Sequence, residues 1–192
     1  DNLQRIVRDT AVISQSSLLE ANEFIYNRIV KYVSIEQDIG KCKKNQTVRL
    51  IDFEYPDNNE FLVVNQFKLQ GQKENIRPDL ILFVNGLPLA VIEAKSPYKT
   101  NPLEEAIDQL RRYANLRNAK EQEGHERLFW YNQIMVATCR YRARLGTISS
   151  NLSHYLEWKD PYPKTLEELG KNPTQQEILI QAVFNKVACL DI

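Results

Sequence analysis

The stretch RPDLILFVNGLPLAVIEAKSP, residues 77–97, constrains the fold of this chain more than any other part of it. Two apolar runs of strand length flank Asn85-Gly86, a dipeptide typical of tight hairpin turns. The second run should be buried, yet it ends in Glu93-Ala94-Lys95. Charges inside a buried strand cost free energy unless a partner compensates them. The stretch therefore predicts a hairpin whose charged end needs a compensating partner.

The charged residues of this hairpin can converge at one rim of a sheet. In an extended strand residues i and i+2 share a face, so Glu93 and Lys95 point the same way. Asp79 begins the first run, near the same edge. Two carboxylates suit a hard divalent cation such as Mg²⁺, and a lysine beside them suits the charge that develops during phosphodiester hydrolysis. A metal-free Glu93–Lys95 ion pair is the alternative interpretation.

The turn decides whether such a site can assemble. A regular two-residue hairpin would pair Val84 with Leu87. Counted outward, Asp79 would then pair with Ile92 and face away from Glu93. The site therefore requires either a three-residue loop or a β-bulge within the hairpin. Either would turn the aspartate onto the face of the glutamate.

Composition excludes several other kinds of protein. The chain has only two histidines, which excludes a multi-histidine metal site. Its three cysteines are scattered along the chain, which argues against a disulfide framework or a thiolate zinc site. The formal net charge is zero, so contact with nucleic acid must come from a local basic patch. Neither a membrane-length apolar run nor the apolar core of a signal peptide is present. We expect a cytoplasmic protein without a membrane partner.

The hydrophobic patterns predict an α/β (α+β) domain with one mixed central β-sheet flanked by helices. Polar segments at 35–46 and 140–147 are expected to be loops. Asn101-Pro102 with Glu104 behind it is a strong helix start. The expected helical segments are 16–33, 101–119, 152–159 and 174–192, and the expected strands are 47–55, 61–69, 79–84, 88–95 and 134–139.

Pro78-Asp79 followed by Glu93-Ala94-Lys95 resembles the PD-(D/E)xK nuclease signature. The longer string, with flanking similarity over most of 47–160, is similar to the N-terminal nuclease region of the restriction (R) subunit of type I restriction–modification enzymes. The resemblance implies a restriction-endonuclease-like core. It also implies a nuclease domain at 1–160 and, at 161–192, a linker and helix leading toward a motor domain absent from this chain.

The resemblance implies a function as well. A domain of this family would cleave double-stranded DNA with Mg²⁺ and without sequence preference of its own, using Asp79 and Glu93 as metal ligands and Lys95 in catalysis. Its partners would be DNA and the methylation and specificity subunits, and ATP would serve only the absent translocase. The alternative is a catalytically inactive nuclease fold that acts as a DNA-binding or docking module.

Further residues extend the predicted site. Some nucleases of this class carry a Q-x-x-x-Y motif, which Gln109 and Tyr113 match on one face of the expected helix. Nucleases of this class often take another acid from an early helix, for which Glu20 and Glu23 are the candidates, and Glu20 is the one kept. A second acid-x-Lys triplet, Glu157-Trp158-Lys159, has no aspartate-bearing strand before it. The DNA-contact candidates are the arginines that leave the strand at 134–139: Arg140, Arg142 and Arg144.

Overall fold

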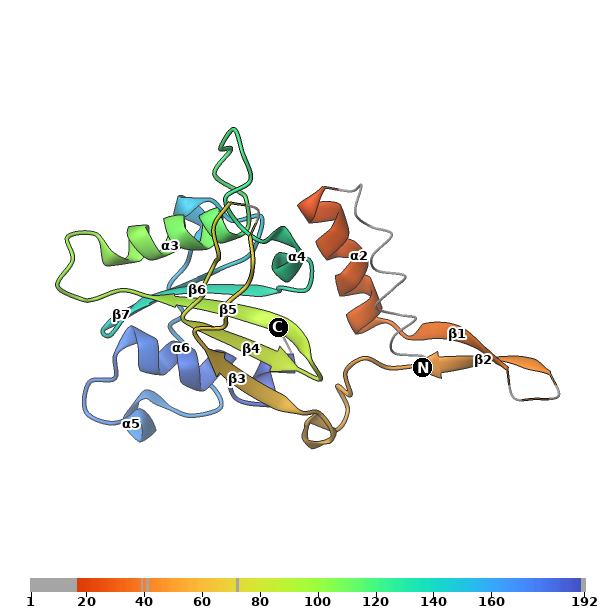
Figure 1. The fold of residues 1–192 in the computed structure, drawn as a ribbon. Coiled ribbons are helices and arrows are strands. Elements are labelled where there is room, and N and C mark those ends of the chain that lie inside the picture. Colours follow the sequence, from red (N-terminus) through yellow and green to blue (C-terminus); the bar gives the residue numbers. More distant parts are fainter. Residues whose placement is uncertain (1–16, 39, 41, 72, 191–192) are drawn as a thin grey trace.

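The computed structural model describes residues 17–38, 40, 42–71 and 73–190. A five-stranded mixed sheet forms its centre, in the order β3-β4-β5-β6-β7 (Figure 1). Only β5 and β6 are parallel, and the other neighbours are antiparallel. The mixed α/β architecture confirms the predicted fold class. The strands are β3 (Phe61–Asn65), β4 (Leu80–Val84), β5 (Leu87–Ala94), β6 (Ile134–Cys139) and β7 (Arg142–Gly146).

Helices cover both faces of this sheet. Helix α3 (Pro102–Tyr113) connects β5 to β6, and its buried side chains join a core cluster that includes Val91 and Ala137. Helix α6 (Gln175–Val183) packs on the opposite face, in a second cluster that includes Ala90. Because both faces of β6 are covered, all six of its residues are buried, as its mostly apolar run predicts.

The β4–β5 hairpin contains the offset that the site requires. Val84 pairs with Leu87 across the Asn85-Gly86 turn, so the three-residue loop is wrong. The register then shifts: Phe83 pairs with Pro88 but Leu82 pairs with Ala90, which leaves Leu89 as an extra residue. The predicted β-bulge is therefore confirmed.

Helix α2 (Leu18–Val30) begins with Ser17 as its N-cap and lies within the predicted helical segment 16–33. Its buried side chains, among them Ile25, share a cluster with Phe129 of the short helix α4 (Glu126–Phe129). After α2 the chain forms a two-stranded antiparallel sheet, β1 (Val33–Asp38) and β2 (Lys43–Val48). This small sheet extends away from the central one (Figure 1).

Several sequence-based predictions of individual elements are wrong. The loop expected at 35–46 is largely β1 and β2, and the strand expected at 47–55 ends at Val48. The basic segment expected to be a loop at 140–147 contains β7. Polar strands lack the alternating pattern on which a strand prediction depends, and they form here because a neighbouring strand supplies their hydrogen bonds. The helix expected at 152–159 is a single 3₁₀ turn, Leu152–His154.

The C-terminal segment 161–192 contributes to the same core as the sheet. It contains the short helix α5 (Leu166–Leu169) and α6, whose residues Leu179, Ala182 and Val183 pack against the central strands. The helix expected over 174–192 ends at Val183, and a 3₁₀ turn follows at Ala188–Leu190. Within the described part of the chain, no helix is long and apolar enough to cross a membrane.

The turn of the β4–β5 hairpin yields the first prediction. Gly86 has a φ of +80° and no heavy atom within 4 Å of a Cβ built on it, so its backbone conformation alone restricts substitution. We expect Gly86→Ala to lower the free energy of unfolding by about 1 kcal/mol, measured by urea denaturation. Gly86→Asn is the matched control, because asparagine tolerates positive φ, and it should recover most of the loss. Equal stability of the alanine variant and the parent would contradict this account.

Candidate active site

Asp79 and Glu93 meet at the rim of the sheet where β4 begins and β5 ends. Because Leu80 pairs with Ile92 beyond the bulge, the preceding aspartate comes opposite the glutamate. Asp79 Oδ2 accepts a hydrogen bond from the backbone N–H of Ala94 at 2.8 Å. The bulge thus places both carboxylates on the face of the sheet that α3 covers.

Lys95 joins Glu93 to α3. Its Nζ lies 2.6 Å from Glu93 Oε1 and 2.6 Å from Gln109 Oε1. The side chain of the glutamate is 2% exposed and that of the lysine 16%, so the pair is shielded from water. The backbone N–H of Lys95 donates to the carbonyl of Thr138, which extends the β5–β6 ladder up to the site.

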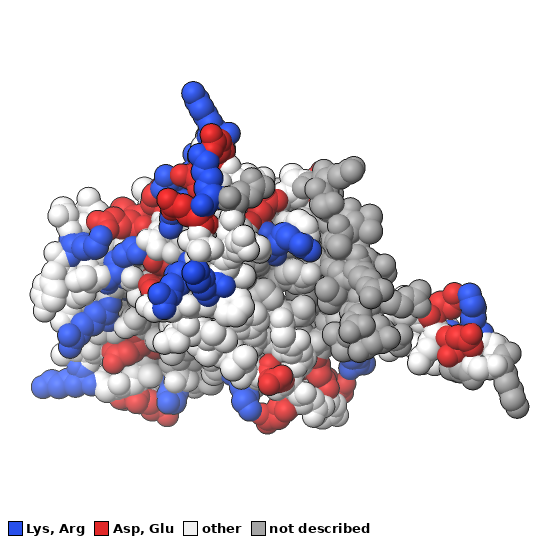
Figure 2. Space-filling model, in the orientation of Figure 1, with Lys and Arg blue, Asp and Glu red and all other residues white. Residues whose placement is uncertain are grey.

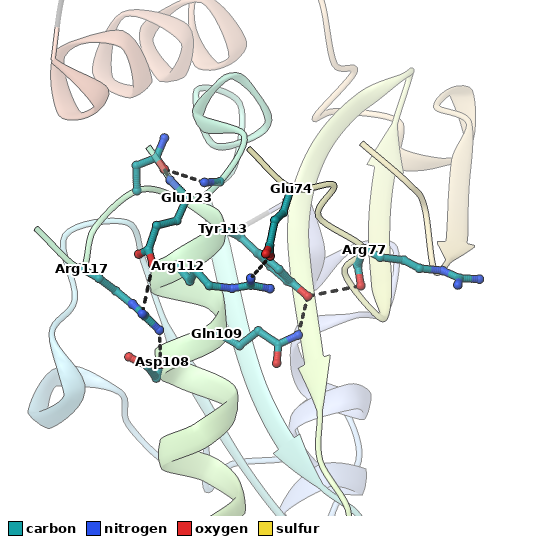
Figure 3. A network of polar contacts seen from close by, with 10 residues as sticks. Glu74, Arg77, Asp108, Gln109, Arg112, Tyr113, Arg117 and Glu123 are labelled. Carbon is teal, nitrogen blue, oxygen red and sulfur yellow. Dashed lines mark hydrogen bonds and ion pairs between the residues drawn. The ribbon is translucent and has the colours of Figure 1, made fainter. Parts of the chain in front are cut away.

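Gln109 and Tyr113 continue this network along α3. They lie one turn apart on the same helix face, and the Gln109 amide donates to the Tyr113 hydroxyl. The Tyr113 hydroxyl in turn donates to the backbone carbonyl of Arg77 at 3.3 Å, as Figure 3 shows. A chain of hydrogen bonds therefore runs from Glu93 through Lys95 and α3 to the segment that leads into β4.

The end of α3 is held by a loop that folds back on it. His125 N–H donates to the carbonyl of Tyr113, and Asn115 Oδ1 accepts from the N–H groups of Glu123 and Gly124. A Cβ on Gly124 would collide with the Tyr113 carbonyl, so only glycine fits there. This contact explains why the helix ends at Tyr113 rather than near 119 as expected.

Burial and the neighbouring Lys95 act in opposite directions on the pKa of Glu93. Desolvation by burial raises the pKa of this carboxyl above its ordinary value, and the nearby charge of Asp79 raises it further. The hydrogen bond and the charge of Lys95 oppose that increase. Burial also raises the pKa of the Tyr113 hydroxyl, which keeps it a hydrogen-bond donor at neutral pH.

The donor set fits a hard divalent cation. Glu93 Oε2 is buried and has no hydrogen-bond partner among the described residues, which is costly unless another group binds it. Asp79 supplies a second carboxylate from the adjacent strand. No cluster of three His, Cys, Asp or Glu side chains occurs in residues 17–38, 40, 42–71 and 73–190. A cation bound here would complete its coordination with water or substrate oxygen, as Mg²⁺ commonly does.

Glu20 lies elsewhere in the fold. It is the N3 residue of the capping box of α2, where its carboxylate accepts hydrogen bonds from the backbone N–H and hydroxyl of Ser17. These bonds lower the pKa of the exposed Glu20 carboxyl. The structure therefore gives this residue a local capping role and does not bring it to Asp79 and Glu93.

The three candidate DNA-contact arginines lie at the far edge of the sheet. Arg140 is in the turn after β6, with its guanidinium over the Tyr141 ring, and Arg142 is exposed on β7. Arg144 pairs with Ala137, which pairs with Glu93 on its other side. Strand β6 therefore separates these arginines from the two carboxylates.

Arg77 is a residue of this site that sequence reasoning missed. Its carbonyl accepts from Tyr113, and its Nε donates to the carbonyl of Gln66 at 3.3 Å. No spacing rule identifies it, because its side chain is directed by the carbonyl of Gln66, which belongs to the segment after another strand. Glu74 was also missed; it pairs with Arg112, whose guanidinium lies over the Tyr113 ring.

A mixed sheet with helices on both faces, and a rim bearing Asp, Glu and Lys on adjacent strands, is consistent with the restriction-endonuclease-like class of folds. The chain belongs to a family within that class, because residues 2–154 match the family described as type I restriction enzyme R protein N terminus.

Individual relatives agree with this family. The chain is 34% identical over 155 residues to the type I restriction enzyme HindI endonuclease subunit of Haemophilus influenzae, a match that covers 80% of this chain and 14% of the relative. It is 29% identical over 181 residues to a putative type I restriction enzyme MjaIXP endonuclease subunit of Methanocaldococcus jannaschii, covering 85% and 17%. The chain thus spans under a fifth of the length of these relatives.

The buried pair gives a prediction about stability. Lys95→Met leaves the Glu93 carboxylate without its cationic partner, so we expect the free energy of unfolding to fall by about 3–5 kcal/mol in urea denaturation. Adding Glu93→Gln removes the unpaired charge, and the double variant should regain part of that loss. If the double variant is no more stable than Lys95→Met alone, the charge of Glu93 is not the cause.

Glu20 allows the capping role to be separated from metal binding. Glutamine can serve in a capping box but is a poor ligand for a hard cation. We therefore expect Glu20→Gln to retain both the helix content, measured by circular dichroism, and any metal-dependent activity. Loss of that activity in a normally folded Glu20→Gln variant would show that the glutamate acts at the metal.

Proposed function

We propose that this chain is a Mg²⁺-dependent endonuclease domain that hydrolyses DNA phosphodiester bonds without sequence preference of its own. The observation that carries the proposal is the meeting of Asp79 and Glu93 on adjacent strands, with the buried Glu93 Oε2 lacking a hydrogen-bond partner in the described part of the chain. Lys95 lies beside these carboxylates, as charge stabilisation during phosphate hydrolysis requires.

Each residue of the site would have a separate role in the hydrolysis. Asp79 and Glu93 would hold Mg²⁺, which when bound supplies Lewis-acid polarisation of a phosphoryl oxygen. Lys95 would place its ammonium against the phosphate where negative charge increases. Gln109 fixes the position of that ammonium through its amide oxygen, and Tyr113 fixes Gln109. The partly exposed rim would admit the phosphate while α3 shields the glutamate from water.

An inactive nuclease fold that only binds DNA or docks is the second candidate. The free-energy cost of burying Glu93 and Lys95 favours the enzyme over the inactive fold. Replacing a buried ion pair with apolar residues of similar volume often stabilises a protein, so a purely structural domain gains little from Glu93 and Lys95. A buried carboxylate oxygen without a partner adds to that cost. Both features are explained if the carboxylates bind a cation.

The relatives' names suggest the larger assembly. Both relatives are named as type I restriction enzyme endonuclease subunits. We propose that this domain acts within a longer R subunit whose ATP-driven translocase lies outside this chain, in a complex with methylation and specificity subunits on double-stranded DNA. Arg140, Arg142 and Arg144 would contact DNA at a distance from the cleaved bond.

A nicking assay tests the proposed activity. The wild-type chain should convert supercoiled plasmid to open circles in Mg²⁺ and not in EDTA. Asp79→Ala and Lys95→Ala should each reduce the rate by about a hundredfold or more, because each removes a group that stabilises the transition state.

The second acid-x-Lys triplet provides the matched control. Lys159→Ala changes a lysine in the same local sequence pattern, and it should leave the nicking rate unchanged. Circular dichroism and urea denaturation must show that the Asp79 and Lys95 variants remain folded. Nicking that persists in a folded Asp79→Ala variant would exclude this site as the nuclease centre.

A further inference from the structure

Arg77 is held rigidly beside the candidate site, although its side chain is exposed. Its carbonyl accepts the Tyr113 hydroxyl at 3.3 Å, and the next residue is the buried Pro78. A residue before proline is restricted to extended conformations, so few backbone rotations are open to Arg77. Figure 3 shows its side chain leading away from Tyr113 and Gln109. The guanidinium is thus directed away from α3.

One peptide unit ties this guanidinium to the aspartate. The N–H of Gln66 donates to the carbonyl of Asp79 at 2.8 Å, and the carbonyl of Gln66 accepts from Arg77 Nε at 3.3 Å. Gln66 has a φ of +48°, an uncommon conformation for a residue other than glycine, immediately after β3. The Nε of Arg77 is therefore held next to the strand position that neighbours Asp79, one strand spacing or ~4.8 Å away from β4.

The other basic residues of α3 and its surroundings use their charged groups in contacts within the protein. Lys95 pairs with Glu93, Lys99 with Glu105, Arg112 with Glu74, and Arg117 with Asp108 and Glu123, while Arg111 donates to the backbone carbonyls of Ser150 and Leu116. For Arg77 no carboxylate partner occurs in the described ranges, and its only side-chain hydrogen bond there is the one through Nε. Figure 2 shows acidic and basic side chains interspersed on the face it draws. An unpaired arginine is accordingly a local source of positive charge.

We propose that Arg77 binds a phosphate of the DNA backbone next to the phosphate that is cleaved. This inference rests on the proposed nuclease function. Its Nε is occupied by Gln66, so the four N–H groups on its two terminal nitrogens remain for the ligand. A guanidinium with that geometry binds two oxygens of one phosphate at once. Lys95 and Arg77 then hold the DNA strand on opposite sides of the two carboxylates.

DNA binding by the 192-residue chain tests this proposal. The probe is a fluorescein-labelled duplex of arbitrary sequence, with Ca²⁺ in place of Mg²⁺. Compared with wild type, Arg77→Ala should raise Kd about tenfold, as expected for loss of a charge-assisted hydrogen bond. The slope of log Kd against log salt concentration should fall by about 0.9, which corresponds to one phosphate contact. Arg77→Lys should retain that slope but only part of the affinity.

Arg127→Ala is the matched control. Arg127 is also exposed and has no acidic partner in the described ranges, but it lies on α4, which precedes β6 and so is at the end of the strands opposite the site. If Arg77→Ala binds DNA no more weakly than Arg127→Ala, the proposal is overturned and the nuclease function is untouched. If binding depends on Arg77 but the wild-type chain does not nick DNA in Mg²⁺, the phosphate contact stands and the proposed nuclease function fails.

Discussion

The register of β4 against β5 determines whether a functional site exists in this fold. The extra residue, Leu89, shifts the pairing so that Asp79 comes opposite Glu93 rather than Ile92. Pro88 supplies a physical reason for the shift, because a residue without an N–H cannot continue the ladder of a central strand and is found at edges or bulges. The Leu89 carbonyl accepts from the N–H of Gln133, so β6 holds the bulge in place from the other side.

The sequence predicts those elements whose signal is local. The run of β6, apolar except for Thr138, identifies both ends of the strand. The elements it misses depend on contacts with another segment of the chain. Strands β1, β2 and β7 are polar and exist because a neighbour completes their ladders. The end of α3 depends on Gly124 packing against the Tyr113 carbonyl, a contact that no helix propensity contains.

The candidate site shows the same division. Asp79, Glu93 and Lys95 could be selected by residue type and spacing, and Gln109 and Tyr113 by the family resemblance. The structure links Glu93, Lys95, Gln109 and Tyr113 in one hydrogen-bonded network, and Asp79 bonds to the backbone N–H of Ala94 beside it. Arg77 could not be selected in that way, because its orientation depends on the unusual backbone conformation of Gln66. Glu20 illustrates the converse: a suitable residue type at a suitable position has its carboxylate already used by Ser17.

The covering of both sheet faces has a consequence for how a substrate would approach. Helices α3 and α6 close the two faces, and Glu93 is 1% exposed, so access to the carboxylates is from the rim. A double helix against such a rim presents the backbone of a single strand to the carboxylates. The proposed nuclease would then need to cut each DNA strand in a separate binding event in order to break both strands. The interval between them would depend on how long the rest of the assembly keeps the DNA close to this edge.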